Sequence, residues 1–468
     1  MDKITKINGM RGKIKGIHFV GIGGIGMSGI AEVLLNLGYA VSGSDLNDTD
    51  TTQRLTALGA KIYRGHHPSH LGDADVVVTS TAVKAYNHEV IEAHRRGVPV
   101  IPRAEMLAEL LKMKFSIAVS GSHGKTTTTS MIATVLANAK MDPTMVIGGK
   151  LGSIGSNAKM GNGEIIVAEA DESDGSFLKL APTMAVITNI DMEHLDYYRD
   201  MKEIKEAFLQ FANIVPFYGA TIVCLDDKNV QEILPKIKRK IVTYGATSPG
   251  DYQARHIKFA GRSSNFLVYF KDKKQAQITL NVPGLFNVSN ALATVAVARE
   301  LDIPFPTIRE GLARFAGVHR RLETKGTVNG ISVIDDYGHH PTEIRVTLAA
   351  VRQMWKDRII VVFQPHRYSR TKALFHEFVS AFQDADTLLL MDIYPAGEEP
   401  IEGVDSFRLC EEIKKRGHQD VSYLPSAEET VARLLAIANP SDAVITLGAG
   451  NVWRVGETFL EELSKRVT

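Results

Sequence analysis

The sequence FSIAVSGSHGKTTTT, residues 115–129, joins an apolar run to a loop with two glycines and then to a run of threonines. The apolar run at 115–120 predicts a buried strand of a parallel sheet, because such strands are covered on both faces. Backbone N–H groups between Gly121 and Gly124 would form a nest for phosphate oxygens. Lys125 adds a positive charge for the β- and γ-phosphates of a nucleotide, and Thr126 offers a hydroxyl to Mg²⁺. The stretch therefore predicts an ATP-binding loop followed by a helix, which we expect over 129–139.

This loop is shorter than the general phosphate-loop pattern, since Val119 stands where that pattern requires glycine. The alternative is a helix cap rich in serine and threonine that binds no ligand. Glycine, lysine and threonine directly behind a strand favour the phosphate site over this alternative. The candidate nucleotide-binding residues are Gly121, Ser122, His123, Gly124, Lys125, Thr126 and Thr127, and Lys125 is also a candidate catalytic residue.

Another glycine loop, GIGGIG at residues 21–26, follows an apolar run and precedes a helical pattern. Asp45 follows Gly26 by 19 residues, at the end of the next predicted strand. This pattern is typical of a site where a diphosphate lies on a helix N-terminus and an acid binds the ribose. NAD and a nucleotide sugar both carry these groups, so the pattern does not distinguish them, and a turn without a ligand is the weaker alternative. The candidate ligand-binding residues here are Gly23, Gly24, Ile25, Gly26 and Asp45.

Carboxylates follow two further predicted strands, at 165–169 and 184–189. Ligand sites of parallel α/β sheets form at this edge. Mg²⁺ prefers a few hard oxygen ligands beside phosphate and water, so Glu169 fits as a ligand next to Thr126. For His194, a role in binding a second metal or phosphate and a purely structural role are equally compatible with the sequence. The other acids of the first cluster are expected to form a solvated loop: Asp171, Glu172 and Asp174.

The bulk composition excludes several classes of function. A formal net charge of +1 gives no support for a nucleic-acid or acidic-membrane partner. Two cysteines, Cys224 and Cys410, are too few for a disulfide framework or a cysteine metal site. No stretch approaches the roughly 18 apolar residues of a membrane span, and the first residues lack the apolar segment of a secretory signal. We therefore expect a cytoplasmic protein.

Further motifs extend over nearly the whole chain, and so many unlinked matches in one order are hard to obtain by chance. They are Glu-Ala-Asp-Glu-Ser-Asp at 169–174, Thr-Asn-Ile at 188–190, Glu-His-Leu-Asp at 193–196, Gly-Leu-Phe-Asn-Val-Ser-Asn-Ala at 284–291, His-Arg-Arg at 319–321, Asp-Asp-Tyr-Gly-His-His-Pro at 335–341, Gln-Pro-His-Arg-Tyr-Ser-Arg-Thr at 364–371 and Gly-Ala-Gly-Asn at 448–451. With the Gly-Lys-Thr loop, they resemble the Mur ligase family, the ATP-dependent amide ligases of bacterial cell-wall precursor synthesis.

The resemblance implies an α/β fold with three domains. Residues 1–108 would form a Rossmann-like domain that binds a UDP-sugar, and residues 109–317 a central P-loop ATPase-like domain that binds ATP. Residues 318–468 would form a Rossmann-like domain that binds an amino acid. The alternation of short apolar runs with helical patterns from residue 17 onward is itself typical of parallel α/β domains. Short alternating segments at 240–280 are expected to hold an insertion.

Within the family, the chain most resembles the member that joins L-alanine to UDP-N-acetylmuramate. The resemblance lies in the first glycine loop, Met-Ser-Gly at 27–29 and the histidine pair at 339–340. The competing member attaches a tripeptide to the same nucleotide sugar during recycling. Several members carry a carbamylated lysine after the metal-binding histidine, whereas residues 207–211, AFLQF, contain no lysine. The alanine-adding member is similar in lacking it. This departure leaves open how a second Mg²⁺ is held.

The resemblance also implies roles for individual side chains. Arginine forks suit the carboxylate of an amino acid, and an imidazole could orient or deprotonate its amine. One histidine of the pair is expected to be structural. The implied catalytic residues are Lys125, His194, His339, Arg367 and Arg370; further ATP contacts are Asn287, Asn290 and Arg321; substrate contacts are Ser80, Thr81, Arg103, His340, Arg367 and Arg370; and the Mg²⁺ ligands are Thr126, Glu169 and His194.

Two other classes of protein compete with this interpretation. A nicotinamide-dependent oxidoreductase would use the first glycine loop but would leave residues 121–128 unexplained. A non-catalytic nucleotide-binding regulator would need the second loop but not the acids and arginines. The expected cofactors are ATP and Mg²⁺, the expected substrates are UDP-N-acetylmuramate and L-alanine, and the expected state is a monomer or weak homodimer without nucleic-acid or membrane partners.

Overall fold

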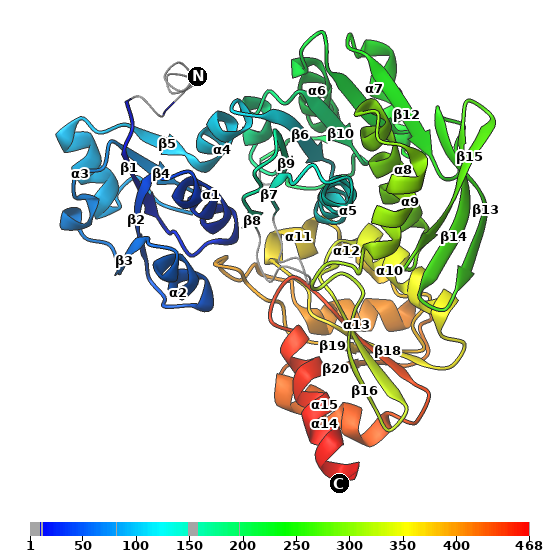
Figure 1. The fold of residues 1–468 in the computed structure, drawn as a ribbon. Helices are drawn as coiled ribbons and strands as arrows, with labels where there is room; N and C mark the ends of the chain where they lie inside the picture. The colour runs from blue at the N-terminus through cyan, green and yellow to red at the C-terminus, as the bar shows by residue number, and fades with distance from the viewer. Residues whose placement is uncertain (1–9, 11–12, 81, 148–157, 196, 468) are drawn as a thin grey trace. The chain divides into compact units, whose positions relative to one another are not determined.

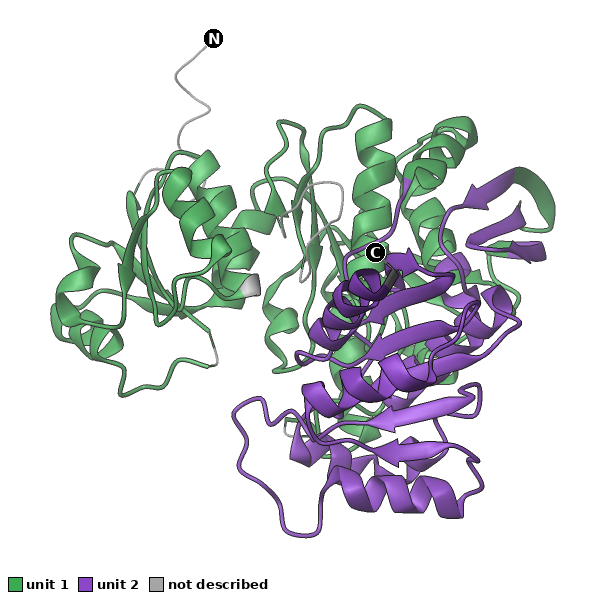
Figure 2. Cartoon of the chain, turned by 90° about the horizontal axis from the view of Figure 1, so that it is seen from below, with its two compact units in different colours: residues 1–253, 268–276, 289–314 green, residues 254–267, 277–288, 315–468 purple. Residues whose placement is uncertain are grey.

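The computed structural model describes residues 10, 13–80, 82–147, 158–195 and 197–467. Figure 1 draws their helices and strands, coloured from the N-terminus to the C-terminus. The chain divides into two compact units, coloured in Figure 2. Unit 1 comprises residues 1–253, 268–276 and 289–314, and unit 2 comprises residues 254–267, 277–288 and 315–468.

The first sheet of unit 1 is five-stranded and entirely parallel, with strand order β3-β2-β1-β4-β5. Its central strand has the sequence GIHFV, which is buried on both faces beyond the first residue and so carries almost no polar residue. Its strands are β1 (Gly16–Val20), β2 (Ala40–Asp45), β3 (Lys61–Arg64), β4 (Val76–Thr79) and β5 (Val100–Pro102), and its helices are α1 (Ile25–Asn36), α2 (Asp50–Ala57), η2 (Pro68–Leu71), α3 (His88–Arg96) and α4 (Arg103–Leu111).

The second sheet has ten strands in the order β15-β14-β13-β12-β11-β10-β6-β9-β7-β8. From β12 to β7 its neighbours run parallel, and β8 pairs antiparallel with β7. The strands are β6 (Phe115–Ser120), β7 (Thr144–Val146), β8 (Ala158–Lys159), β9 (Ile165–Glu169), β10 (Met184–Ile187), β11 (Ala220–Cys224), β12 (Ile241–Gly245), β13 (Tyr252–Ala260), β14 (Ser263–Phe270) and β15 (Lys273–Leu280). The helices are α5 (Lys125–Asn138), η3 (Ser176–Lys179), α6 (Met201–Ile214), α7 (Lys228–Ile233), η4 (Leu234–Lys236), α8 (Leu285–Glu300) and α9 (Phe305–Arg314).

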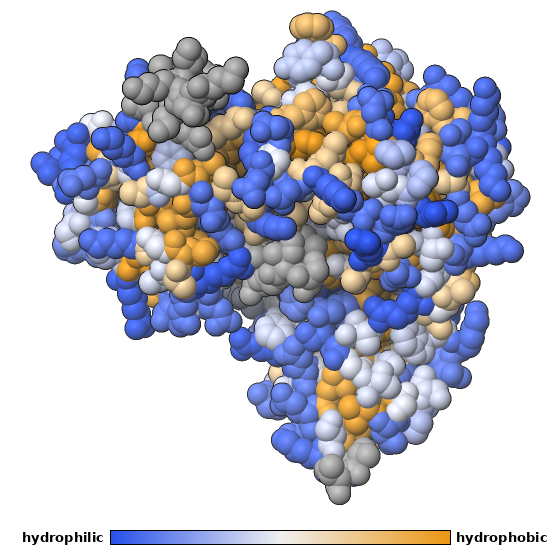
Figure 3. Space-filling view, viewed as in Figure 1, coloured by the Kyte–Doolittle hydropathy of each residue, from blue (hydrophilic) through white to orange (hydrophobic). Residues whose placement is uncertain are grey.

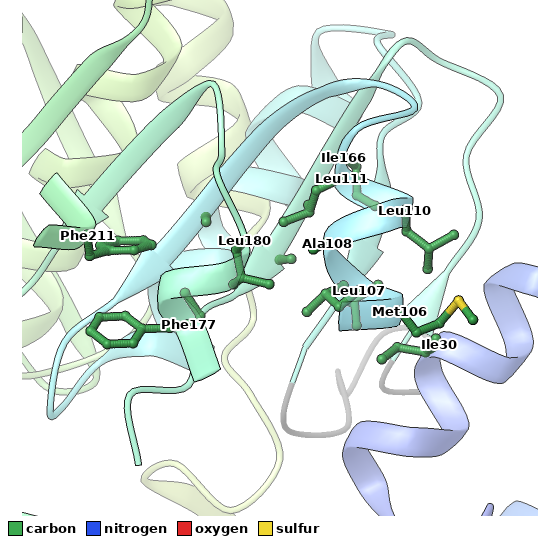
Figure 4. Packing of buried hydrophobic residues seen from close by; sticks show 14 of the residues in the cluster. Ile30, Met106, Leu107, Ala108, Leu110, Leu111, Ile166, Phe177, Leu180 and Phe211 are labelled. Carbon is green, nitrogen blue, oxygen red and sulfur yellow. The ribbon is translucent and has the colours of Figure 1, made fainter. Parts of the chain in front are cut away.

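Helix α4 has apolar side chains that pack in both directions within unit 1. Figure 4 shows Met106 beside Ile30 of α1, and Leu111 beside Ile166 of β9. All four side chains belong to one buried cluster that extends from the first sheet to the second. The predicted domain boundary at residue 108 falls inside this helix, and both predicted boundaries, at 108 and 317, stay predictions.

Unit 2 contains a six-stranded sheet with the order β16-β17-β21-β18-β19-β20, antiparallel only between β16 and β17. Apolar clusters cover both of its faces. The strands are β16 (Glu323–Val328), β17 (Ile331–Asp336), β18 (Ile359–Phe363), β19 (Thr387–Leu390), β20 (Val421–Tyr423) and β21 (Ala443–Leu447), and the helices are α10 (Pro341–Met354), α11 (Tyr368–Ala373), α12 (Phe375–Val379), α13 (Ser406–Lys415), α14 (Ala427–Ile437) and α15 (Trp453–Val467).

The predicted α/β class with mainly parallel sheets is confirmed. One helix start was wrong: the helix after the second glycine loop begins at Lys125, not at residue 129. Gly124 turns the chain into it with φ of +85°, so the threonines belong to the helix despite their modest helix propensity. The segment at 240–280 forms β12 and the long strands β13, β14 and β15.

Figure 3 shows hydrophilic residues over most of the visible face, with hydrophobic ones in scattered groups among them. Within the described part of the chain, every helix is too short or too polar to cross a membrane.

The core of unit 1 predicts a specific loss of stability for Phe208→Ala. Phe208 of α6 is fully buried and meets Phe177 edge to face, with ring centroids 5.4 Å apart. Truncation should reduce the free energy of unfolding by about 3–5 kcal/mol, from lost burial and the cavity left behind. Urea denaturation followed by circular dichroism measures this change.

The matched control is Gln210→Ala, two residues later on the same helix and exposed, which should change the free energy of unfolding by less than about 0.5 kcal/mol. Both tryptophans, Trp355 and Trp453, lie in unit 2, so their fluorescence reports separately on that unit. Equal losses for the two variants would contradict the assigned packing.

Candidate active site

The second glycine loop connects β6 to α5 through two positions that only glycine fits. Gly121 has φ of +137°, and a Cβ atom there would collide with Thr188 Oγ1. Gly124 has φ of +85°, and a Cβ atom there would lie 2.9 Å from Asn290 Oδ1. Gly124 is also the N-cap of α5 and offers no side-chain cap. The first N–H groups of this helix are therefore available to an anion, which is the cradle expected for phosphate.

Lys125 is held against the loop by oxygen acceptors. Its Nζ donates to Gly121 O at 2.6 Å, Ser122 O at 3.2 Å and Glu172 Oε1 at 2.8 Å. Burial alone would lower the pKa of Lys125, but the negative charges around it, first that of Glu172, outweigh burial and raise that pKa above its usual range. Lys125 is thus a fixed positive charge at the N-terminus of α5.

Glu172 overturns the expectation of a solvated loop at this position. The residue is only 1% exposed, and the Tyr198 hydroxyl donates to its backbone carbonyl at 2.7 Å. Its Oε1 atom also lies 3.4 Å from His194 Nε2, whereas its Oε2 atom is buried with no hydrogen-bond partner among the described residues. Asp171 and Asp174 are only partly exposed. The loop folds inward because Lys125 and His194 provide partners for the buried carboxylate.

His194 stands beside two carboxylates in a strained backbone position with φ of +56°. Ligand atoms of Glu172, Glu193 and His194 lie within 4.8 Å of one another. Burial lowers the pKa of His194, but the hydrogen bond to Glu172 and the charge of Glu193 outweigh it, so that pKa is raised. Two carboxylates, one with a buried unpartnered oxygen, fit a divalent cation with hard-ligand preference.

The end of β10 holds the loop in shape. The Thr188 hydroxyl donates to His123 O at 2.6 Å, and Asn189 Oδ1 accepts from His123 N at 2.8 Å. His123 Nε2 lies 3.1 Å from Asp191 Oδ2, and Asp191 N donates to Ser122 Oγ at 2.8 Å. No role was predicted for the Thr-Asn-Ile motif. Its position directly after β10, a strand parallel to β6, is the sequence feature that could have indicated a role beside the glycine loop.

The two candidate asparagines of α8 make different contacts. Asn290 Oδ1 accepts from the Thr128 hydroxyl at 3.1 Å, so Asn290 lies against the glycine loop. Asn287 Nδ2 donates to Pro283 O at 2.7 Å, one turn earlier along the chain. Both residues are buried. Asn290 is therefore brought to the nucleotide loop, and the hydrogen bond from Asn287 to Pro283 is local to the start of α8.

The first glycine loop is anchored to the end of β2. Gly21 N and Ile22 N donate to Ser44 O at 2.8 and 3.0 Å, and Gly23 N donates to Asp45 Oδ2 at 2.9 Å. Gly21 has φ of +79°, and Gly24 is the N-cap of α1 without a side-chain cap. The loop thus leaves a second helix N-terminus available to an anion.

Arg103 lies across the start of α1. A Cβ atom on Gly26 would come 2.8 Å from Arg103 Nη1, so the last glycine of the motif makes room for the guanidinium. Arg103 Nη2 also lies 3.4 Å from Asp171 Oδ2. Ser80 follows β4 directly and its carbonyl accepts from Val83 N, while Thr81 lies outside the described residues. Ile25 is the first residue of α1.

Polar side chains also converge in unit 2. The rings of His339 and His366 lie 5.7 Å apart, and Arg370 Nη1 is 3.1 Å from His366 Nδ1. Burial, with the charges of His339, Arg370 and Arg367, lowers the pKa of His366 to about 3, so this imidazole is neutral near pH 7. Arg367 precedes α11 with φ of +70° and donates its N–H to Tyr394 O. His366 was not among the predicted site residues.

His340 and Arg321 have structural contacts within the same unit. His340 is buried and caps α10, where its Nδ1 accepts from Thr342 N at 3.3 Å. Arg321 Nη1 lies 3.5 Å from Glu343 Oε1 and its guanidinium stacks over Tyr337 at 5.1 Å. The capping role of His340 agrees with the expectation that one histidine of the pair is structural.

Models of known protein families match most of the chain. Residues 16–115 match the Mur ligase family catalytic domain, residues 119–298 the Mur ligase middle domain, and residues 320–450 the Mur ligase glutamate ligase domain. These three matches agree with the predicted fold of three α/β domains.

Individual relatives cover nearly the full length. A UDP-N-acetylmuramate–L-alanine ligase from Syntrophus aciditrophicus is 63% identical over 463 residues, which cover 99% of this chain and 96% of the relative. The crystal structure of UDP-N-acetylmuramate–alanine ligase from Thermotoga maritima matches with a TM-score of 0.82 at 30% identity, over 97% of this chain and 100% of that one. A murein peptide ligase from Psychrobacter arcticus matches with a TM-score of 0.70 at 28% identity, over 96% and 98%. The chain therefore belongs to the Mur ligase family.

Proposed function

We propose that this protein is an ATP-dependent ligase that joins L-alanine to the muramate carboxylate of UDP-N-acetylmuramate. The observation that carries the proposal is the partly buried Lys125 at a helix N-terminus, with Glu172 and His194 beside it, in a chain whose 63% identical relative bears that activity in its name. The two buried free cysteines are consistent with the cytoplasm, the compartment we propose for the reaction.

The chemistry explains why the protein needs a phosphate site at all. A free carboxylate is a poor acyl donor, and transfer of the γ-phosphoryl group of ATP to it would give an acyl phosphate. The alanine amine would then attack the acyl carbon, and inorganic phosphate would leave. Lys125 would neutralise charge on the transferring phosphoryl group, because its ammonium is fixed beside the loop that would hold the phosphates.

Thr126, Glu169 and His194 are the proposed Mg²⁺ ligands, with Glu172 and Glu193 completing the donor set beside His194. When bound, Mg²⁺ would neutralise phosphate charge in the transition state. Glu172 thereby offers an answer to the absence of the carbamylated lysine: a second carboxylate at the same sheet edge provides negative charge near His194.

The first glycine loop would hold the UDP diphosphate at the N-terminus of α1. Arg103 lies directly over this helix start and would add a cationic fork. Ser80, which follows β4, and Thr81 are further proposed contacts. Asp45 binds Gly23 N through one carboxylate oxygen and Asn47 N through the other. In this protein Asp45 would therefore shape the loop as well as face a ribose.

In unit 2, Arg367 and Arg370 are the proposed partners of the amino-acid carboxylate. His339 would orient the incoming amine, since His340 already caps α10. His366 stays neutral near pH 7 and fixes Arg370 through its Nδ1 atom. His366 is therefore added to the proposed positioning residues.

The second candidate function is addition of a tripeptide to the same nucleotide sugar, the alternative that the sequence left open; a murein peptide ligase resembles this chain at 28% identity. Both reactions use the same two phosphate sites and differ only in the amine. The family assignment and the second glycine loop argue against a nicotinamide-dependent oxidoreductase.

Phosphate release should depend on the amine that is added. With ATP, Mg²⁺ and UDP-N-acetylmuramate, phosphate should be released on addition of L-alanine, because only the amine completes the reaction. A coupled phosphate assay with no amine, with L-alanine and with the tripeptide measures this requirement. Phosphate release with the tripeptide but not with L-alanine would establish the recycling reaction. If neither amine led to phosphate release, the ligase proposal would be contradicted.

Lys125→Ala should lower kcat by roughly 1,000-fold, since it removes the charge closest to the transferring group. Its affinity for UDP-N-acetylmuramate, measured by calorimetry, should stay within a factor of about two, because that ligand is assigned to the other glycine loop. The control is Lys112→Ala, an exposed lysine paired with Glu109, which should keep normal activity. Loss of sugar-nucleotide binding in the Lys125 variant would mean that the loops are assigned wrongly.

Glu172→Gln should lower kcat by roughly 100-fold or more and raise the Mg²⁺ concentration needed for half-maximal rate, because it removes the charge shared by Lys125 and His194. Steady-state rates over a Mg²⁺ titration measure both effects. Asp174→Asn is the matched control: Asp174 Oδ1 accepts from Ser176 N, and asparagine retains that acceptor. Normal turnover in the Glu172 variant would contradict a role for Glu172 in holding Lys125 and Mg²⁺.

A further inference from the structure

A fully buried carboxylate lies in the first sheet, and the proposed chemistry does not use it. Glu89 of α3 has no exposed surface. Its Oε1 atom accepts from His70 Nδ1 at 2.9 Å and from His67 N at 3.3 Å. Its Oε2 atom accepts from the Ser44 hydroxyl at 2.5 Å and lies 3.4 Å from His66 Nδ1 and 3.6 Å from His18 Nε2.

These contacts keep Glu89 ionised inside the protein. Burial opposes the charged form, but the nearby His18 side chain and the hydrogen bonds from Ser44 and His70 outweigh it and lower the pKa of Glu89 to about 2. A buried carboxylate without such partners would be strongly unfavourable. The contacts come from β1, β2, the segment after β3 and η2, so Glu89 ties four parts of the chain together.

The hydroxyl of Ser44 fixes the direction of the neighbouring hydrogen bond. A serine hydroxyl has one hydrogen, and here it is donated to Glu89. Ser44 Oγ must therefore accept from His66 Nδ1, which lies 2.9 Å away. His66 is thereby held in one orientation, with a hydrogen on Nδ1, and its side chain is 21% exposed.

The same serine anchors the first glycine loop. Its backbone carbonyl accepts from both Gly21 N and Ile22 N. The next residue, Asp45, accepts from Gly23 N through its side chain and from Gly65 N through its carbonyl. Displacement of Ser44 would therefore move the loop and the segment before His66 together.

We propose that Glu89 is a positioning residue for the sugar-nucleotide site: through Ser44 it fixes the first glycine loop, and through Ser44 and His70 it fixes the histidine segment that follows β3. This inference rests on the proposed assignment of that loop to the UDP-sugar. Glu89 does not touch the ligand; it acts by holding the loop backbone in the conformation that receives the diphosphate.

Glu89→Gln provides a nearly isosteric test. If the amide nitrogen faces Ser44, the hydroxyl loses its acceptor; if it faces His70, donor meets donor at His70 Nδ1 and His67 N. Either arrangement disturbs the anchor of the loop. Affinity for UDP-N-acetylmuramate should fall by roughly 10- to 100-fold, as for loss of a hydrogen bond to a charged group. The KM for ATP should change by less than about twofold, a split that a general loss of stability does not produce.

The matched control is Glu92→Gln, one turn later on α3, where the carboxylate pairs only with exposed Arg95 and Arg96 in the described structure; it should bind normally. Calorimetry with UDP-N-acetylmuramate and with an ATP analogue, on variants that unfold cooperatively, gives the comparison. Ser44→Ala, which removes the hydroxyl but leaves Glu89 in place, should weaken sugar-nucleotide binding in the same direction and covers the case in which Glu89→Gln does not fold.

Unchanged sugar-nucleotide affinity in folded Glu89→Gln, or in Ser44→Ala, would overturn the positioning role. Equal weakening of ATP and sugar-nucleotide binding would also overturn it, because the effect would then be global. Failure of the unaltered protein to bind UDP-N-acetylmuramate would instead contradict the proposed function itself.

Discussion

The ion pair between Lys125 and Glu172 is the interaction on which the proposed active site depends. A buried ion pair contributes little net stability, yet removal of one partner costs about 3–5 kcal/mol because the other charge is left unpaired. The pair therefore works as a constraint on geometry. It holds the ammonium at the mouth of the glycine loop and draws the acidic loop after β9 inward, next to His194.

The parallel sheet explains why these groups meet. Strands β9, β6 and β10 are neighbours in the second sheet, and their C-terminal ends lie at one edge. The glycine loop follows β6, the acidic loop follows β9 and the Thr-Asn-Ile segment follows β10. Three segments separated by up to 70 residues in the chain thus build one site, as parallel α/β sheets generally allow. The first sheet repeats this principle with β1 and β2 around the other glycine loop.

Local patterns were sufficient to predict much of this arrangement. Both glycine loops, the α/β class and the placement of Lys125 follow from short motifs whose physical requirement is local. Glu172 was missed because an acidic cluster after a strand looks the same whether solvated or buried; only its partners distinguish the two. The Glu89 network was missed for the same reason, since His18, Ser44 and His70 come from different elements. The start of α5 was placed too late because the left-handed Gly124 lets threonines enter the helix. His340 caps α10 because that helix begins at Pro341. The start of the helix was not predicted, so the capping role of His340 was not predicted either.

Three oxygens, Gly121 O, Ser122 O and Glu172 Oε1, hold Lys125 Nζ beside the N-terminus of α5, where we propose that the terminal phosphates of ATP bind. A crystal structure with a non-hydrolysable ATP analogue, Mg²⁺ and UDP-N-acetylmuramate tests this claim most directly. We expect the triphosphate on the N-terminus of α5, with Lys125 Nζ within hydrogen-bonding distance of its terminal phosphate, and the diphosphate of the sugar nucleotide on the N-terminus of α1. A triphosphate bound elsewhere, with Lys125 remote from it, would contradict the proposed role of Lys125.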